Sequence, residues 1–311
     1  MRDRSRWVWV MLVGLTSGCG DDTGPGDDVP ADGDVAAEAD GGGDADGDTG
    51  ADADVADHAD TDAAVPPSPG CGAATTGVPA TWTERTVTVG GAVRTYFVWL
   101  PEGYDRWRPY PVVYQLHGCS GSATREDNNV PVQRESGAEA VHVRGRAAAD
   151  CWDSAADGPD VAFFDAMVTA VEAEFCADPG RRFVTGYSSG SFMAHRLACI
   201  RGAELRAVAT IAGGQAGRSC TGNVAALLIH DDTDGTVGID ASLGARDDYR
   251  TRNGCDPEAE PVAFDPDPCV AYVGCDPRLP VVWCPTTGQG HSRQDDLAAP
   301  AFWRFLSSLP R

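Results

Sequence analysis

The stretch Gly186-Tyr187-Ser188-Ser189-Gly190 constrains the fold of this chain more than any other. Residues 181–185 form an apolar strand pattern before it, and residues 191–200 carry apolar side chains at helical spacing after it. A G-x-S-x-G sequence between a strand and a helix predicts a sharp turn that lifts the serine hydroxyl above the end of a sheet. Only small residues fit beside so tight a turn, which explains the flanking glycines. We therefore predict that Ser188 is a nucleophile.

Acidic residues are concentrated near the start of the 311-residue chain. Residues 20–70 contain sixteen Asp and Glu but no Lys or Arg, and residues 1–19 carry +2, so residues 71–311 hold only −9 of the total charge of −23. Residues 20–70 are rich in Asp, Ala and Gly and have too little apolar bulk to fold, which predicts a disordered linker. Residues 71–311 are predicted to form the catalytic domain. No basic patch stands out, which argues against nucleic-acid binding.

Residues 1–19 have the pattern of an export signal. Arg2, Arg4 and Arg6 precede a short apolar run that is too short to span a membrane. The segment Leu15-Thr16-Ser17-Gly18-Cys19 resembles a bacterial lipobox, although its leucine lies one place further from the cysteine than usual. We predict a signal peptide over residues 1–19 and lipidation at Cys19, with an ordinary cleaved signal peptide as the alternative. The eleven cysteines agree with an oxidising compartment, so we expect a secreted or cell-surface protein that contacts the membrane only through this anchor.

Strand and helix patterns alternate along residues 71–311. Alternating apolar residues on both sides of Gly90-Gly91 predict a hairpin, and residues 160–175 carry apolar side chains at helical steps. Further strands are predicted at 111–116, 139–143, 205–212, 224–230 and 281–283, and a last helix at 297–309. This order predicts an α/β fold with a mainly parallel sheet of about eight strands flanked by helices.

A serine hydroxyl needs a base to accept its proton, and the base needs an acid that fixes its tautomer. In α/β-hydrolases these residues occur in the order Ser, acid, His. The histidines after Ser188 are His195, His230 and His291. His195 is too close to Ser188 along the chain to fold back onto it, and His230 ends a buried-looking strand. His291 lies in a glycine-flanked loop before the last helix and is the predicted base.

Asp231, Asp232 and Asp234 follow the strand that ends at His230 and compete for the role of the acid. Asp234 is furthest into the loop and is our prediction, with Asp232 as the alternative. The tetrahedral oxyanion needs backbone donors. We predict the amides of Ser189, directly after the nucleophile, and Cys119, in the loop after a buried strand.

Residues 80–311 resemble the secreted feruloyl esterase and polyhydroxybutyrate depolymerase family of α/β-hydrolases. The motifs that carry this resemblance include Leu100-Pro101-Glu102-Gly103-Tyr104, Leu116-His117-Gly118-Cys119, Cys151-Trp152, Asp160-Val161-Ala162-Phe163, Cys176-Ala177-Asp178-Pro179, Arg182, Leu197-Ala198-Cys199 and Gly290-His291-Ser292, together with the G-x-S-x-G sequence. The resemblance maps Ser188, Asp234 and His291 onto the family's catalytic triad. It implies the α/β-hydrolase fold and a serine esterase that needs neither cofactor nor metal.

The chain departs from the family pattern in three places. Ser191 stands where a second glycine usually follows the elbow, and Asp231 stands where a glycine usually precedes the acid loop. Arg293-Gln294 replaces the aromatic residue and proline that commonly follow Gly-His-Ser. The third difference lies beside the predicted base and concerns substrate preference more than the reaction.

The ten cysteines other than Cys19 fit the stapling of active-site loops by disulfides. The expected pairs are Cys119–Cys151, Cys199–Cys220, Cys255–Cys284, Cys269–Cys275 and Cys71–Cys176. Zinc is the competing interpretation, but the chain contains no C-x-x-C pair.

The resemblance implies hydrolysis of hydroxycinnamoyl esters on plant cell-wall polysaccharide such as xylan. A short-chain polyester depolymerase, acting on polyhydroxybutyrate, and an acetylxylan-type esterase are alternatives with the same mechanism. A non-catalytic surface binding protein on a hydrolase scaffold is an alternative from another class. We expect a monomer whose substrate is a polysaccharide-linked or polymeric ester.

Overall fold

The computed structural model describes residues 65–120, 128–214 and 220–310. The predicted signal peptide, Cys19 and most of the predicted linker lie outside these residues. Packed contacts begin just before Cys71, because the Ser68 hydroxyl donates to the Phe175 carbonyl and the Gly70 amide donates to the Glu172 carbonyl. Within the three described ranges, no helix combines the length and the apolar character needed to cross a membrane.

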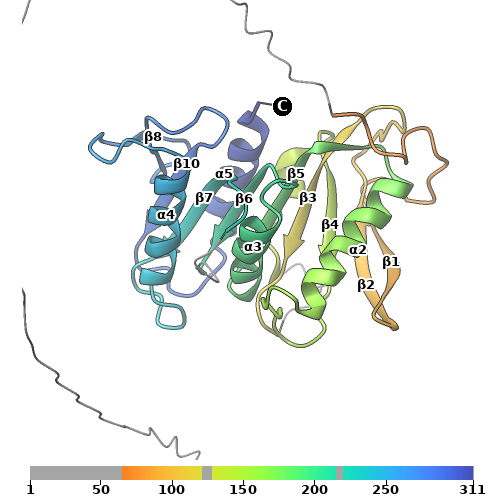
Figure 1. The fold of residues 1–311 in the computed structure, drawn as a ribbon, viewed down its shortest axis with the longest axis horizontal. Coiled ribbons are helices and arrows are strands. Elements are labelled where there is room, and N and C mark those ends of the chain that lie inside the picture. Colours follow the sequence, from red (N-terminus) through yellow and green to blue (C-terminus); the bar gives the residue numbers. More distant parts are fainter. Residues whose placement is uncertain (1–64, 121–127, 215–219, 311) are drawn as a thin grey trace, which may run out of the picture. The chain divides into compact units, whose positions relative to one another are not determined.

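The strands form one sheet in the order β1-β2-β4-β3-β5-β6-β7-β10-β9-β8 (Figure 1). Their bounds are β1 Trp82–Val89, β2 Ala92–Trp99, β3 Tyr110–Leu116, β4 Val141–Gly145, β5 Ala177–Tyr187, β6 Ala207–Ile211, β7 Ala225–Asp231, β8 Val262–Ala263, β9 Val270–Ala271 and β10 Val281–Thr286. The pairs from β4 through β3, β5, β6 and β7 to β10 are parallel. The sequence predicted about eight strands because β8 and β9 contain only two residues each. The prediction of a mainly parallel sheet is confirmed.

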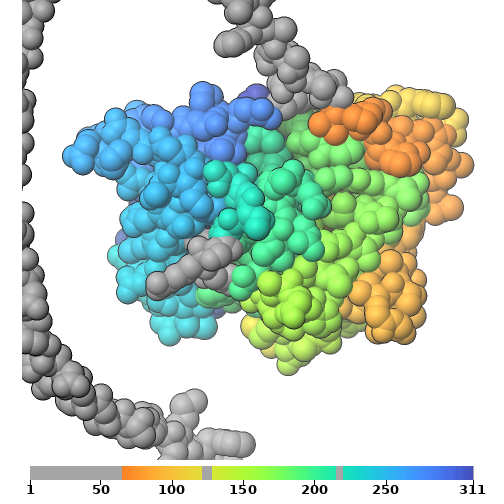
Figure 2. Space-filling view, in the orientation of Figure 1, coloured from red at the N-terminus to blue at the C-terminus, as the bar shows by residue number. Residues whose placement is uncertain are grey.

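Helices cover both faces of this sheet. Their bounds are α1 Gln133–Ser136, α2 Pro159–Glu174, α3 Ser189–Ile200, α4 Asp240–Arg252 and α5 Asp295–Ser308. One buried apolar cluster joins α2, α3 and α4 to one face, and a second joins α5 to the other. In Figure 2 the side chains of α2, α3 and α4 form the visible surface over the sheet.

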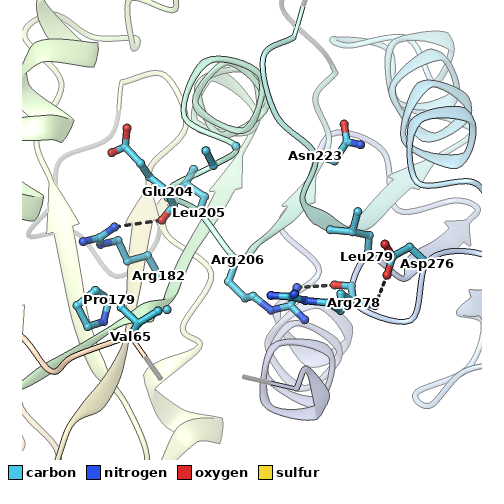
Figure 3. A pocket seen from close by; sticks show the side chains of 13 residues that line it. Val65, Pro179, Arg182, Glu204, Leu205, Arg206, Asn223, Asp276, Arg278 and Leu279 are labelled. Carbon is cyan, nitrogen blue, oxygen red and sulfur yellow. Dashed lines mark hydrogen bonds between the residues drawn. The ribbon is translucent and has the colours of Figure 1, made fainter. Parts of the chain in front are cut away.

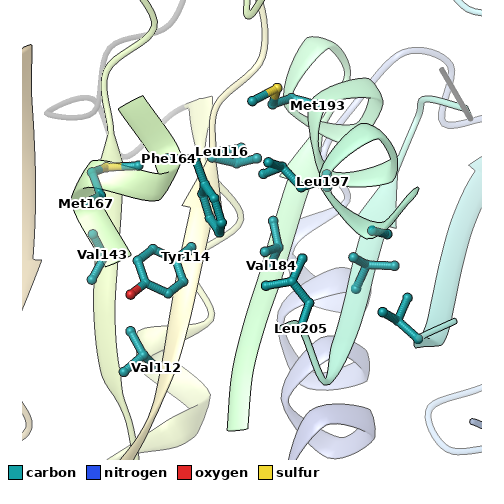
Figure 4. Packing of buried hydrophobic residues seen from close by; sticks show 14 of the residues in the cluster. Val112, Tyr114, Leu116, Val143, Phe164, Met167, Val184, Met193, Leu197 and Leu205 are labelled. Atoms are coloured by element: carbon teal, nitrogen blue, oxygen red, sulfur yellow. The ribbon is translucent and has the colours of Figure 1, made fainter. Parts of the chain in front are cut away.

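The central strands are rich in apolar residues because both of their faces are buried. In β3, Val112 and Tyr114 belong to the cluster under α2 and α3, whereas Val113 belongs to the cluster under α5. Figure 4 shows Tyr114 beside Phe164 of α2 and Val184 of β5 near Leu197 of α3. The continuous apolar run in β3 therefore places the strand in the middle of the sheet.

Ten cysteines form five disulfides. Three pairs are as expected from the sequence: Cys71–Cys176, Cys119–Cys151 and Cys199–Cys220. The predicted pairs Cys255–Cys284 and Cys269–Cys275 are wrong, since the structure joins Cys255 to Cys275 and Cys269 to Cys284. Five disulfides are typical of a protein that folds in an oxidising compartment outside the cytosol.

The position of the sheet explains the correction. Cys255 follows α4 and belongs to the apolar cluster on that face, and Cys275 packs against the same cluster. Cys269 and Cys284 belong to the cluster on the α5 face. A bond between Cys255 and Cys284 would have to pass through the sheet.

Candidate active site

Ser188 lies in the turn between β5, which ends at Tyr187, and α3, which begins at Ser189. Its φ is +53°, a value that few residues other than glycine adopt. The turn is possible because no side chain stands beside it: a Cβ on Gly186 would lie 2.2 Å from the Gly190 carbonyl oxygen. A Cβ on Gly190 would lie 2.1 Å from the carbonyl oxygen of Leu116, at the end of β3. The two glycines let α3 start directly against the sheet.

His291 connects Ser188 to Asp234. Its Nε2 lies 2.9 Å from Ser188 Oγ, and its Nδ1 lies 2.7 Å from Asp234 Oδ2. Because an ionised carboxylate only accepts hydrogen bonds, Nδ1 carries the proton that points at Asp234, and Nε2 accepts from the Ser188 hydroxyl. This arrangement can remove the hydroxyl proton and stabilise the imidazolium that results. The structure thus brings together the three residues that the sequence singled out.

The Asp234 carboxylate is fixed on both of its oxygens. Oδ1 accepts the amides of Thr236 and Val237 at 2.8 and 2.9 Å, and Oδ2 accepts from His291. Burial would raise the pKa of Asp234, but the hydrogen bonds from His291 and from the two amides outweigh burial and lower the pKa below its ordinary value of 3.8. Asp234 is therefore ionised at neutral pH.

The other candidates, His195, His230 and Asp232, form hydrogen bonds to residues other than Ser188 and His291. His195 is buried, with its Nδ1 3.0 Å from the Tyr249 hydroxyl. His230 is also buried, and its Nε2 binds the Val237 carbonyl and lies 3.4 Å from Asp234 Oδ2. Asp232, the alternative acid, is exposed, and its backbone amide donates to the Thr286 carbonyl at 3.0 Å. The carboxylate that contacts His291 is that of Asp234.

The loop after β3 lies against the elbow. A Cβ on Gly118 would meet the Tyr187 ring at 2.8 Å, so the backbone that leads to Cys119 passes directly over the residue before Ser188. The Cys119–Cys151 disulfide ties this loop to Trp152, whose amide donates to Ser189 Oγ at 2.8 Å. The predicted oxyanion donors, the amides of Cys119 and Ser189, therefore belong to two segments that are bonded to each other.

His117 also holds this loop in place, through hydrogen bonds of its ring and its carbonyl. Its Nε2 accepts the Ala147 amide, its Nδ1 donates to the Gly118 carbonyl, and its own carbonyl accepts from Trp152 Nε1. Burial lowers the pKa of His117 and so favours the neutral ring, and the bonds to the Ala147 amide and the Gly118 carbonyl determine its tautomer.

Two of the three departures from the family pattern have local structural explanations. Ser191 is fully buried, and its Cβ would be 2.4 Å from a Cβ on Gly213, so the extra side chain occupies space that Gly213 leaves open. Arg293 donates to the Asn129 carbonyl at 3.1 Å and pairs with Asp295 at 2.7 Å.

Asp231, the remaining departure, ends β7 and is 1% exposed. Its Oδ2 accepts the Gln289 amide at 2.9 Å, and its Oδ1 accepts the Gly290 amide at 2.9 Å and the Thr233 amide at 3.0 Å. The Thr233 hydroxyl also donates to Oδ1. Burial would raise the pKa of Asp231, but these hydrogen bonds outweigh it and hold the pKa well below its usual range.

A separate pocket of about 590 Å³ lies at the opposite ends of the strands (Figure 3). It is lined by residues just before or at the start of β5, β6, β7 and β10, among them Arg182, Arg206 and Asn223. Figure 3 shows Arg206 bonded to the Arg278 carbonyl and Arg182 bonded to the Glu204 carbonyl. No described group of three or more His, Cys, Asp or Glu residues is placed to hold a metal ion.

No family model matches the chain. Feruloyl esterase D of Neurospora crassa is 31% identical over 270 residues, which cover 79% of this chain and 91% of the relative. Feruloyl esterase C of Emericella nidulans is 33% identical over 198 residues, which cover 61% and 70%. The chain belongs to the feruloyl esterase family. It is a carboxylic ester hydrolase of the serine esterase type.

Solved structures show the same α/β-hydrolase fold in other feruloyl and acetyl xylan esterases. A ferulic acid esterase from Anaeromyces mucronatus has a TM-score of 0.52 at 17% identity, covering 76% of this chain and 93% of that one. An acetyl xylan esterase from Aspergillus awamori has a TM-score of 0.52 at 17% identity, covering 68% and 94%. At such low identity these two similarities concern the fold alone.

Sequence reasoning missed two contacts of the esterase's site. Tyr187 donates its hydroxyl to the His291 carbonyl at 3.2 Å, with ring centroids 5.3 Å apart. Asp231 was considered as a candidate acid and as a departure from the family pattern, but its bonds to the loop that carries the base were not predicted. Its replacement of the family's glycine was the only signal that could have pointed to a separate role.

The depressed pKa of Asp231 predicts a loss of stability in acid. A group whose pKa is lower in the folded state stabilises the fold fully above its unfolded pKa, near 3.8, and loses that contribution as the pH falls toward the folded value. Asp231→Asn should lower the urea midpoint at pH 7 and make it less dependent on pH below about 4. Urea unfolding of both proteins from pH 2.5 to pH 7, with disulfides intact, measures this. Parallel curves for the two proteins would contradict the prediction.

Proposed function

We propose that this member of the feruloyl esterase family cleaves hydroxycinnamoyl esters of plant cell-wall polysaccharide, with Ser188, His291 and Asp234 as its catalytic residues. The observation that carries the proposal is the position of His291, within hydrogen-bond distance of both Ser188 Oγ and Asp234 Oδ2. The family relationship supports the substrate class, since the relatives are feruloyl esterases.

The reaction has two halves. Ser188 Oγ attacks the ester carbonyl while His291 Nε2 takes the hydroxyl proton, and the amides of Ser189 and Cys119 donate to the oxyanion. The tetrahedral intermediate collapses by breaking the bond to the alcohol oxygen, which receives the proton from His291. A water molecule that loses its proton to His291 then attacks the acyl-enzyme carbonyl. The bond from the carbonyl carbon to Ser188 Oγ breaks, Oγ takes the proton back from His291, and the carboxylic acid leaves. Asp234 orients the imidazole and stabilises its cation in both halves.

Export and anchoring are a second part of the proposal. The export pattern of residues 1–19, the Leu15–Cys19 segment and the five disulfides support a secreted protein that is lipidated at Cys19. Residues 20–67 would then act as an acidic tether that holds a monomeric enzyme away from the membrane, since the packed domain begins at Ser68.

The nucleophile and the substrate are tested together. Wild type and Ser188→Ala are assayed on methyl ferulate, a p-nitrophenyl acetate ester, acetylated xylan and a polyhydroxybutyrate suspension. We expect hydrolysis of methyl ferulate, and a loss of kcat by a factor of about 10⁴ or more in Ser188→Ala. Unchanged rates in the variant would remove Ser188 from the mechanism.

The other outcomes of this assay separate the alternatives. Clearing of the polyester alone would favour a depolymerase, and activity on acetylated xylan alone would favour an acetylxylan-type esterase. No hydrolysis, together with no labelling of Ser188 by a fluorophosphonate, would favour a non-catalytic binding protein.

The assignment of the acid is tested by a matched pair of variants. Asp234→Asn should lower kcat on the order of 10⁴-fold, because an amide in place of the carboxylate no longer holds the imidazole in the required tautomer. Asp232→Asn changes a neighbouring exposed carboxylate and should leave kcat within about twofold of wild type. Steady-state kinetics on the best substrate measures kcat for both variants. A large loss in Asp232→Asn with little change in Asp234→Asn would assign the acid to Asp232.

Lipidation is tested by Cys19→Ala in the full chain, expressed in an export-competent bacterium with labelled palmitate. We expect the wild type to carry label and to partition with membranes, and the variant to do neither. If the wild type and Cys19→Ala are both soluble and neither carries label, the result would instead support an ordinary cleaved signal peptide.

A further inference from the structure

We propose that Asp231 is a positioning residue, which fixes the loop that carries His291 to the loop that carries Asp234. The inference rests on the proposed catalytic function of these two residues. The carboxylate of Asp231 accepts the amides of Gln289 and Gly290, the two residues directly before His291. On its own side it accepts the amide and the hydroxyl of Thr233, the residue directly before Asp234. One side chain therefore joins the segments next to the base and next to the acid.

The charge of Asp231 makes this connection strong and specific. The carboxylate is almost completely buried, and an ionised group in such a place is costly unless hydrogen bonds satisfy it. In the described part of the chain, the Asp231 carboxylate accepts hydrogen bonds from three backbone amides and one hydroxyl, and none of these donors belongs to an arginine. Hydrogen bonds to a charged acceptor are about twice as strong as neutral ones. Any movement of residues 289 and 290 away from Asp231 would leave its buried charge less satisfied.

The His291 loop needs such a restraint because its backbone is intrinsically permissive. Gly288 and Gly290 have φ values of +76° and +58°, and a Cβ at either position would meet nothing within 4 Å. Packing therefore does not select this loop conformation at either glycine. Two consecutive amides held by one carboxylate fix the path of the backbone at the point where it enters His291.

The remaining contacts of His291 are complementary to this restraint. The Tyr187 hydroxyl donates to the His291 carbonyl, and Asp234 orients the ring through Nδ1. Asp231 instead fixes the position of the backbone at Gln289 and Gly290, and so the distance between His291 Nε2 and Ser188 Oγ. Misplacement of a reacting group by about 1 Å can cost about a hundredfold in rate. The family's usual glycine at this position has no side chain to make these bonds, so this restraint depends on the aspartate.

Asp231→Ala in the full-length enzyme tests the proposal, with Asp232→Ala as the matched control. Removal of the Asp231 carboxylate should lower kcat about 10- to 100-fold, change KM less than about threefold and slow fluorophosphonate labelling of Ser188 in the same proportion. Asp232→Ala removes an exposed carboxylate from the adjacent position and should match wild type in all three measurements.

Chemical rescue separates positioning from a merely structural role. Formate is a free carboxylate that fits the space left by the lost side chain and can accept the same donors from Gln289, Gly290 and Thr233. It should restore at least a third of the lost kcat in Asp231→Ala, and leave wild type and Ser188→Ala unchanged. If the alanine variant does not fold, Asp231→Asn is measured in its place, and it should lose kcat at unchanged KM because its amide NH₂ faces backbone N–H donors.

Two results would overturn the inference: wild-type kcat in the folded Asp231 variant, or a loss of kcat in Asp231→Ala that formate leaves unchanged. Neither result bears on the proposed function, which depends on Ser188→Ala. An active Ser188→Ala variant would overturn the proposed function, and the inference with it.

Discussion

The close approach of α3 to the end of β3 is the constraint on which the rest of the site depends. Ser188 adopts a positive φ only because the chain must reverse from β5 into α3 within one residue. That reversal requires bare backbone at Gly186 and Gly190, where a Cβ would overlap a carbonyl oxygen. The same contact brings the loop after β3 beside Ser188. Nucleophile and proposed oxyanion donors therefore follow from one packing arrangement.

The parallel sheet then determines which other loops can reach Ser188. Strands β7 and β10 are parallel neighbours, so the loops at their carboxyl ends leave the sheet at the same edge as the elbow. One loop supplies Asp234 and the other supplies His291. Their side chains meet because polar contacts hold each loop, including those of Asp231 to residues 289 and 290 and the Tyr187 hydroxyl to the His291 carbonyl. The site is thus built from main-chain restraints as much as from its three reactive groups.

Disulfides hold parts of the fold that the sheet does not. Cys119–Cys151 joins the loop after β3 to the segment that bonds Ser189, and Cys71–Cys176 fixes the start of the domain beside β5. Cys255–Cys275 lies on the face of the sheet that α4 covers, and Cys269–Cys284 lies on the face that α5 covers. Each of these bonds supports a connection between elements rather than an element itself.

The sequence by itself determined the elbow, the alternation of strands and helices, and the order Ser188, Asp234, His291. These features are local or follow from chain order, and glycine spacing and apolar runs record them directly. The helix α4 was not predicted, because its buried positions are Ser242, Ala245 and Tyr249 and so give little apolar periodicity. The disulfide partners of Cys255 and Cys269, and the contacts of Asp231, were decided only by the tertiary structure. They depend on which face of the sheet a residue occupies and on which loops become neighbours, and neither can be read from spacing along the chain.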